Sequence, residues 1–176
     1  MPVDTIFEHP AFAFQPTDKL IDLGAGVGKP TALAVLEFGA AEGIGVELSP
    51  TRFQAGCEAL GRLAAAVTVA ENAADDDLVT IELQLGDVLS ASLAETDRVI
   101  LFATCFPGGL QDELKLKLAT ELKAGAKVFA AGTTTWGANF TAAGPGCAAS
   151  LVRGGSDGGA DVESKVWEAF RRPCDF

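Results

Sequence analysis

The sequence contains no tyrosine, a single histidine and no long hydrophobic run. Its apolar runs, such as Val99–Phe102, are far shorter than the roughly 20 residues that a membrane-spanning helix needs. His9 lies far in sequence from every glycine-rich turn, which argues against a Ser-His or Cys-His hydrolase. The absence of tyrosine removes the Tyr-Lys pair of hydride-transferring enzymes. We therefore expect neither a membrane protein nor a hydrolase of this kind.

Cysteines are few and widely separated in the chain. Cys57, Cys105, Cys147 and Cys174 lack the close pairs that a zinc site or a redox motif requires, so we expect reduced thiols. The run of three aspartates at 75–77 is typical of a solvated loop, and we expect no metal. The first residues also lack the basic flank and apolar stretch of a signal peptide, which favours a cytoplasmic location, or a nuclear one.

Basic residues are outnumbered, 13 against 24 acidic ones, and the net charge is -11. Such a charge repels the phosphate backbone of nucleic acids, whose neutralisation supplies much of their binding energy. No nucleic-acid partner is therefore expected. A cationic partner, such as a protein segment containing lysine, would instead be attracted.

The chain reads as a single domain over residues 1–176, because it shows no repeat or linker and is too short for two ordinary domains. Apolar and β-branched runs predict strands at 19–23, 44–47, 78–85, 98–103 and 127–131. Helices are predicted between them, at 30–39, from 51 to beyond 69, and at 111–122. Ser49 and Pro50 mark the start of the second helix, as an N-cap side chain and a proline at the first helical position. Two further strands, 148–153 and 165–170, suggest a terminal hairpin. This order predicts an α/β fold: a Rossmann-like, doubly wound sheet, mostly parallel, with a C-terminal antiparallel hairpin.

The predicted helix at 111–122 carries Leu114, Leu118 and Leu122 at a spacing of four residues. These leucines form one apolar face, and the lysines between them are expected to face solvent.

The most informative motif is Asp22-Leu23-Gly24-Ala25-Gly26-Val27-Gly28, placed between the first strand and the first helix. Glycines allow a tight turn and a close approach of the backbone to a ligand at a helix N-terminus. The third glycine comes one residue earlier than in the dinucleotide fingerprint G-x-G-x-x-G, and the G-K-[ST] ending of a P-loop is absent. A ligand is therefore expected at the carboxyl ends of the strands.

Three acids stand at strand ends, and each also has an ordinary structural interpretation. Asp22 could cap the following helix, Glu47 could be an acid favoured at a helix N-terminus, and Asp87 could cap a short turn. In the ligand-binding interpretation, the two oxygens of Glu47 suit a vicinal diol.

The acid-x-G-x-G-x-G turn resembles motif I of the class I S-adenosylmethionine-dependent methyltransferases. In that superfamily, an acid at the position of Glu47 binds the ribose hydroxyls, and a residue at the position of Asp87 binds the adenine amino group. The loop from Thr104 matches the one that faces the transferred methyl. The resemblance implies S-adenosylmethionine as cofactor, bound by Asp22, Gly24, Ala25, Gly26, Gly28, Glu47, Leu48, Asp87, Val88 and Thr104.

Within this superfamily, the stretches VELSPTRFQAG, GD and LFATCFPGGLQDELKLKLATELKAGAKVF are most similar to the disruptor-of-telomeric-silencing-like and related small protein-lysine methyltransferases. This resemblance implies N-methylation of lysine in a protein substrate, with a function like that of a histone methyltransferase. Thr104, Phe106 and Trp136 are the candidate catalytic residues. The two aromatic side chains could provide apolar walls that lower the pKa of a lysine amine.

The sequence is also compatible with two other functions. Thr104, Cys105 and Phe106 stand where the histone enzymes carry an asparagine, so the chain could be a catalytically silent domain that binds S-adenosylmethionine, acting as a scaffold or partner subunit. An NAD-dependent oxidoreductase would share the fold and an acid on the second strand, but the early third glycine disfavours it.

Overall fold

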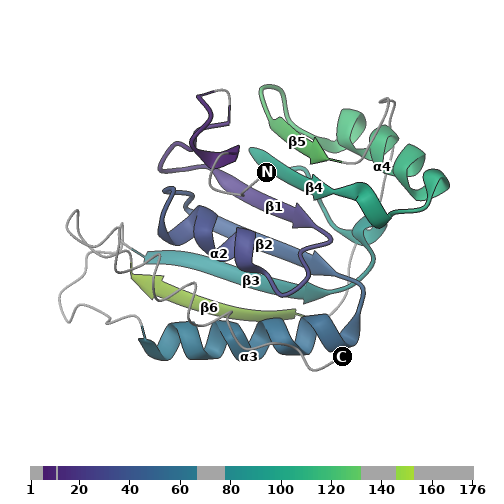
Figure 1. The fold of residues 1–176 in the computed structure, drawn as a ribbon. Coiled ribbons are helices and arrows are strands. Elements are labelled where there is room, and N and C mark those ends of the chain that lie inside the picture. The colour runs from purple at the N-terminus through teal and green to yellow at the C-terminus, as the bar shows by residue number, and fades with distance from the viewer. Residues whose placement is uncertain (1–5, 11, 67–77, 132–145, 153–176) are drawn as a thin grey trace.

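A computed structural model of the protein describes residues 6–10, 12–66, 78–131 and 146–152, with the backbone alone for 78 and 146–152. Its centre is a six-stranded β-sheet (Figure 1). In chain order the strands are β1 (Lys19–Leu23), β2 (Glu42–Glu47), β3 (Leu78–Leu85), β4 (Arg98–Phe102), β5 (Lys127–Ala131) and β6 (Gly146–Val152). The α-helices are α2 (Lys29–Leu36), α3 (Pro50–Ala66) and α4 (Gly108–Glu121), and the short 3₁₀ turns are η2 (Val88–Ser90) and η3 (Ala103–Cys105).

The strand order β5-β4-β1-β2-β3-β6 places β1 at a change of direction in the topology. From β1 the chain proceeds through β2 and β3 on one side, and then through β4 and β5 on the other. The first five strands run parallel, and β6 pairs with β3 antiparallel. This arrangement confirms the predicted Rossmann-like, doubly wound fold. In such sheets a ligand binds outside the carboxyl ends of the strands at the point where the order reverses.

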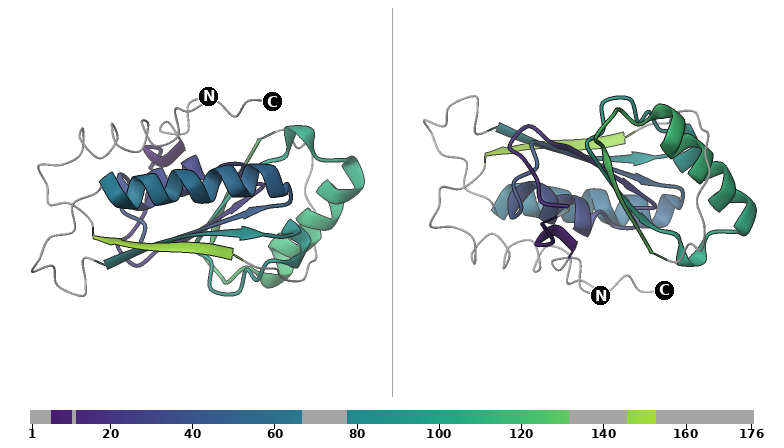
Figure 2. Two further views of the ribbon diagram at one scale, coloured as in Figure 1. Left: turned by 90° about the horizontal axis from the view of Figure 1, so that it is seen from below. Right: turned by 90° about the horizontal axis from the view of Figure 1, so that it is seen from above.

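Helices cover the sheet on both faces, as a parallel sheet requires (Figure 2). On one face, apolar residues of α2 and α3 and the phenylalanines of the N-terminal segment pack against β1, β3 and β4. On the other face, Leu114 and Leu118 of α4 pack against β1, β2 and β4. The alternation of side chains therefore fixes which residues of β1 face α2: Leu20 and Asp22 on that side, Ile21 and Leu23 on the other.

Helix α2 packs closely against β2, because the residues of β2 that face it are glycines. A Cβ atom on Gly43 would lie 2.8 Å from Cγ2 of Val35 and 3.1 Å from the carbonyl oxygen of Thr31. A Cβ on Gly45 would meet Leu83 at 2.6 Å. These glycines therefore allow α2 to pack directly against the sheet. The packing places the N-terminus of α2 at the carboxyl ends of the strands.

Most predicted boundaries are confirmed within a few residues. Strands β1, β3 and β5 have the predicted limits, and α3 begins at Pro50, directly after the Ser49 that was expected to precede it. Helix α2 ends at Leu36, before the expected Gly39, and α4 begins at Gly108 rather than at Gln111. The first strand of the predicted hairpin is β6. The second, 165–170, lies outside the described residues, as does the predicted continuation of α3 beyond Ala66.

Two expectations about side chains are wrong. Lys115 and Lys117 of α4 do not face solvent; they are buried, with 7% and 0% of their surface exposed. The Lys115 ammonium group pairs with Asp112 of the same helix, and that of Lys117 donates to the carbonyl oxygen of Ala91. Cys57 is disulfide-bonded rather than reduced. Cys105 is a free, exposed thiol, as expected.

Among the described residues, no helix combines the length and apolar character needed to cross a membrane. Within the same ranges, no cluster of three or more His, Cys, Asp or Glu side chains could hold a metal ion. The three aspartates at 75–77 lie outside those ranges.

Candidate functional site

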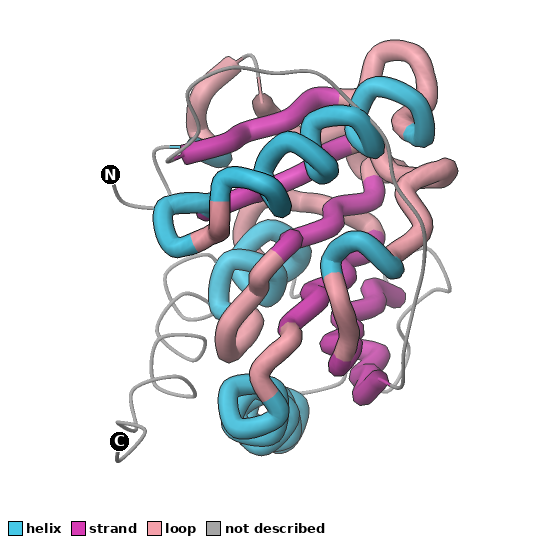
Figure 3. Tube along the Cα trace, turned by 90° about the vertical axis from the view of Figure 1, so that its right-hand side faces the viewer, coloured by secondary structure: helices cyan, strands magenta, loops and turns pink. Residues whose placement is uncertain are grey.

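The glycine turn joins β1 to α2 at the carboxyl edge of the sheet, which faces the viewer in Figure 3. Gly24, Gly26 and Gly28 all have positive φ angles, of 89°, 59° and 82°, which residues with a side chain rarely adopt. The backbone N–H groups of Gly24 and Ala25 donate to the carbonyl oxygen of Val46, at 2.9 and 3.0 Å. The turn is therefore fixed to the end of β2.

The surroundings of the three glycines differ. A Cβ on Gly24 would lie 2.8 Å from the Phe106 ring, and one on Gly28 would lie 2.5 Å from Leu83. A Cβ on Gly26 would meet no atom within 4 Å. Gly24 and Gly28 are thus packed against side chains, whereas the middle of the turn faces open space, where a ligand could approach the backbone.

Among the carboxylates of the site, Glu47 accepts the most hydrogen bonds. Its Oε2 accepts from the N–H of Gly26 at 2.9 Å, and its Oε1 accepts from the N–H of Ser49 at 2.7 Å and from Nη2 of Arg52 at 2.8 Å. A carboxylate has about four acceptor positions, so one remains on Oε2. Glu47 is 3% exposed, whereas the Arg52 side chain is 55% exposed. Because the Arg52 side chain is more than half exposed, solvent can replace its interactions, and it is the partner of Glu47 that a ligand could displace most readily.

Asp22 lies on the same face of the sheet, at the end of β1, and is 1% exposed. Neither of its carboxylate oxygens has a hydrogen-bond partner of good geometry, and neither does the nearby hydroxyl of Thr31. Burial raises the pKa of Asp22 to about 7; Thr31 opposes this rise, and the negative charge of Glu47 adds to it. A buried carboxylate without partners is costly, so it indicates a position where a cationic ligand would be favoured.

Asp87 follows the end of β3, beside Glu47 in the sheet. The N–H of Gly86 donates to the carbonyl oxygen of Glu47 at 3.0 Å. Asp87 is exposed, and its Oδ1 accepts from the N–H of Leu89 at 2.8 Å. It therefore caps η2, as the structural interpretation of the sequence suggested, yet no described residue donates to Oδ2. Asp87 can cap the turn and still accept a hydrogen bond from a ligand.

The loop after β4 approaches the glycine turn from the other side. Thr104 is exposed, and Phe106 is half-buried with its ring against Gly24. The side-chain amide of Gln111 donates to the carbonyl oxygens of Ala103 and Phe106, at 3.2 and 2.9 Å, and so fixes the loop to α4. Trp136, the third predicted catalytic residue, lies outside the described residues.

The structure therefore gathers most of the predicted site residues at one edge of the sheet. Leu48, beside Glu47, is 67% exposed although it is apolar. Ala25 and Val88 are buried, so each could contact a ligand only through its backbone.

Arg52 and Gln111 were not predicted as residues of the site. A basic residue in the first turn after the strand-end acid was the signal for Arg52, whereas nothing in the pattern distinguished Gln111.

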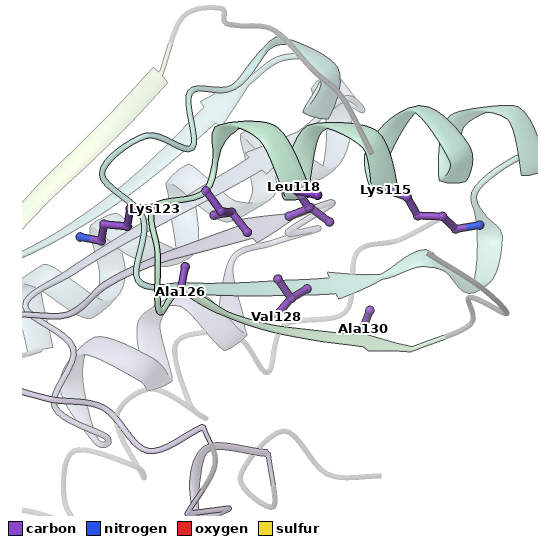
Figure 4. Close-up of a pocket in the computed structure, with 8 residues that line it drawn as sticks. Lys115, Leu118, Lys123, Ala126, Val128 and Ala130 are labelled. Carbon is purple, nitrogen blue, oxygen red and sulfur yellow. The ribbon is translucent and has the colours of Figure 1, made fainter. Parts of the chain in front are cut away.

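A separate pocket of about 630 Å³ lies between α4 and β5 (Figure 4). Its floor is apolar, with Leu118 and Val128 at its centre, and the ammonium groups of Lys115 and Lys123 point away from it at opposite ends. Those two lysines pair with carboxylates of Asp112 and Asp97. None of the predicted site residues lines this pocket.

The fold and the site together define a class of protein. A doubly wound sheet, with a glycine turn after β1 that is hydrogen-bonded to an acid at the end of β2, is the arrangement of a class I methyltransferase domain. Residues 3–136 match the family model of the histone methylation protein DOT1. The chain belongs to this DOT1 family. No curated protein matches the chain.

Proposed function

We propose that the protein is an S-adenosylmethionine-dependent methyltransferase that N-methylates lysine in a protein substrate, and that residues 1–176 form one domain. The observation that carries this proposal is the Glu47 carboxylate. It is buried, held against the open turn at Gly26, and retains an acceptor position. Membership of the DOT1 family supports methylation of a histone or another lysine-containing protein.

The residues at the strand ends fit the cofactor in charge and in hydrogen-bonding capacity. Glu47 can accept from a ribose hydroxyl, Oδ2 of Asp87 can accept from the adenine amino group, and Leu48 offers an apolar surface for the base. The buried Asp22 carboxylate favours the positive charge that S-adenosylmethionine carries. The residues proposed to hold the cofactor are Asp22, Gly24, Ala25, Gly26, Gly28, Glu47, Leu48, Asp87, Val88 and Thr104.

When bound, the cofactor would supply a methyl group on a positively charged sulfur: a neutral amine would bond to the methyl carbon as the carbon–sulfur bond breaks and the neutral thioether leaves, which needs no metal. The work of the chain is then to position the amine and to favour its neutral form. A lysine amine has a reference pKa near 10.4, and apolar surroundings lower it. Phe106, held by Gln111 against the glycine turn, is the described aromatic side chain proposed for this role, beside Thr104. A role for Trp136 and a cytoplasmic or nuclear location remain parts of the proposal.

The proposal is tested by transfer of a tritiated methyl group from S-adenosylmethionine to core histones. Label is expected on unmodified histones, and not on histones whose lysines have been fully methylated chemically beforehand. Nucleotide binding without transfer to any protein in a lysate would instead favour a silent scaffold or partner subunit. Absence of both binding and transfer would overturn the proposal.

A further inference from the structure

Among the residues whose side chains the structure describes, Lys117 is the largest that is completely buried, with 0% of its surface exposed. It lies in the middle of α4, which packs against η2. Its Nζ donates to the carbonyl oxygen of Ala91, directly after η2, and lies 3.2 Å from Oε2 of Glu121. The same ammonium group therefore connects α4 to the segment that follows Asp87.

A charge at this position is not explained by packing. Burial lowers the pKa of Lys117, and the negative charges of Glu121 and Asp87 oppose this effect. An apolar side chain of similar length would fill the same space without the cost of removing a charge from water. Beyond its ion pair with Glu121, the ammonium group provides a directional hydrogen bond to the carbonyl oxygen of Ala91 and a positive charge within electrostatic range of Asp87.

The segment held by this bond is the one that orients Asp87. Val88 and Ala91 are buried in the apolar cluster below α4, and the carbonyl oxygen of Asp87 accepts from the N–H of Ser90 at 2.7 Å. Oδ1 of Asp87 is held by the N–H of Leu89, so the direction of Oδ2 depends on the geometry of the whole turn.

We propose that Lys117 is a positioning residue for nucleotide recognition: by holding the carbonyl oxygen of Ala91, it fixes the turn so that Asp87 faces the adenine amino group. This inference rests on the proposed function, because it assumes that the nucleotide occupies the strand-end crevice. It predicts a specific effect on the recognition of the amino group, beyond any general loss of stability.

The test compares the affinities of S-adenosylhomocysteine and S-inosylhomocysteine, which carries a carbonyl oxygen where adenine has its amino group. A carboxylate accepts a hydrogen bond from the amino group and repels the oxygen. The wild-type protein is expected to prefer S-adenosylhomocysteine by roughly tenfold or more. Lys117→Met is expected to reduce this preference to about twofold, mainly by weakening S-adenosylhomocysteine, as Asp87→Asn should also do.

Lys115→Met is the matched control, since Lys115 is also a buried lysine of α4, but its ammonium group pairs with Asp112 of the same helix. This variant should keep the wild-type preference. If Lys117→Met does not fold, Lys117→Gln is measured instead; its side chain is one bond shorter and should lose the Ala91 contact and the preference alike.

The outcomes separate the two proposals. If the wild-type protein binds neither nucleotide, the proposed function itself is wrong. If it binds S-adenosylhomocysteine with the expected preference, and a folded Lys117 variant retains that preference, the function stands and the role of Lys117 is overturned. Equal binding of both nucleotides by the wild-type protein also overturns it, because Asp87 would then not read the amino group.

Discussion

Two carboxylates at neighbouring strand ends have opposite environments. Glu47 accepts three hydrogen bonds, whereas Asp22 is buried with none of good geometry. The first is therefore held in one orientation before any ligand arrives. The ionised form of Asp22 is energetically unfavourable unless a positive charge lies beside it, or the carboxylate takes up a proton.

Glu47→Gln is predicted to weaken S-adenosylhomocysteine binding about tenfold or more. The substitution keeps the shape of the side chain but puts an amide NH₂ group where an acceptor oxygen stood, against the N–H of Gly26 or of Ser49. Isothermal titration calorimetry measures the effect. Glu58→Gln, which removes an exposed charge on α3, is the control and should bind as the wild-type protein does.

The raised pKa of Asp22 predicts how stability depends on pH. Its pKa is about 7 in the folded protein and near 3.8 when unfolded, so between these values the folded state binds more protons. The free energy of unfolding should therefore fall as pH rises from about 4 to about 7, by at most on the order of 4 kcal/mol.

Asp22→Asn should remove this contribution. Urea unfolding at several pH values between about 4 and 8 should give a flatter profile for the variant than for the wild-type protein. Glu113→Gln, at an exposed glutamate of α4, should leave the profile unchanged. Parallel profiles for wild-type protein and Asp22→Asn would contradict the assigned environment.

At the scale of elements, the close contact of α2 with β2 places the glycine turn. It depends on Gly43 and Gly45, because any side chain at either position would meet α2 or Leu83. Movement of α2 away from the sheet would displace its N-terminus, and with it the turn that contacts Glu47.

Gly43→Ala is accordingly predicted to lower the free energy of unfolding by about 1 to 3 kcal/mol, because its Cβ would overlap Val35 and the backbone of Thr31. Gly61→Ala is the matched control. Gly61 lies within α3 with no atom within 4 Å of a Cβ, so the substitution should stabilise the protein by about 0.5 to 1 kcal/mol. Equal effects of the two substitutions in urea unfolding would contradict the proposed packing.

The elements that the sequence predicted best are those with strong local signals. Buried apolar runs ending in glycine or in an acid marked β1 and β3, and Ser49-Pro50 marked the start of α3. The burial of Lys117 could not be predicted, because its partner Ala91 lies 26 residues away and offers only a backbone carbonyl. Helical periodicity predicts that a lysine between the leucines is exposed. In the structure Lys117 is instead buried, because α4 contacts a segment that is distant in sequence.

For the candidate site, the sequence predicted where the main motifs lie but did not predict all of their side-chain contacts. The glycine turn and the strand-end acids have fixed positions relative to their elements, so their meeting at one edge followed from the parallel sheet. The contacts of Gln111 depend on the direction of its side chain, which no sequence pattern specified, whereas the ion pair of Arg52 with Glu47 had a signal in the sequence, a basic residue in the first turn after the strand-end acid. The binding roles of these residues stay predictions.

At the scale of the whole molecule, the net charge of -11 favours a cationic substrate. The KM for a lysine-rich histone peptide is predicted to rise several-fold between about 50 and 300 mM NaCl, as screening weakens long-range attraction. The dissociation constant of S-adenosylhomocysteine should change less than about twofold, since its contacts are short-range. A KM that does not change with salt concentration would contradict the claim that the net charge favours binding of a cationic substrate.

The central claim is that the crevice formed by the glycine turn, Glu47 and Asp87 holds a sulfonium nucleotide rather than a dinucleotide. Calorimetric titration of the wild-type protein with S-adenosylhomocysteine and with NAD tests it most directly. The account predicts one bound S-adenosylhomocysteine per chain and no measurable heat with NAD. Binding of NAD with equal or higher affinity would contradict it.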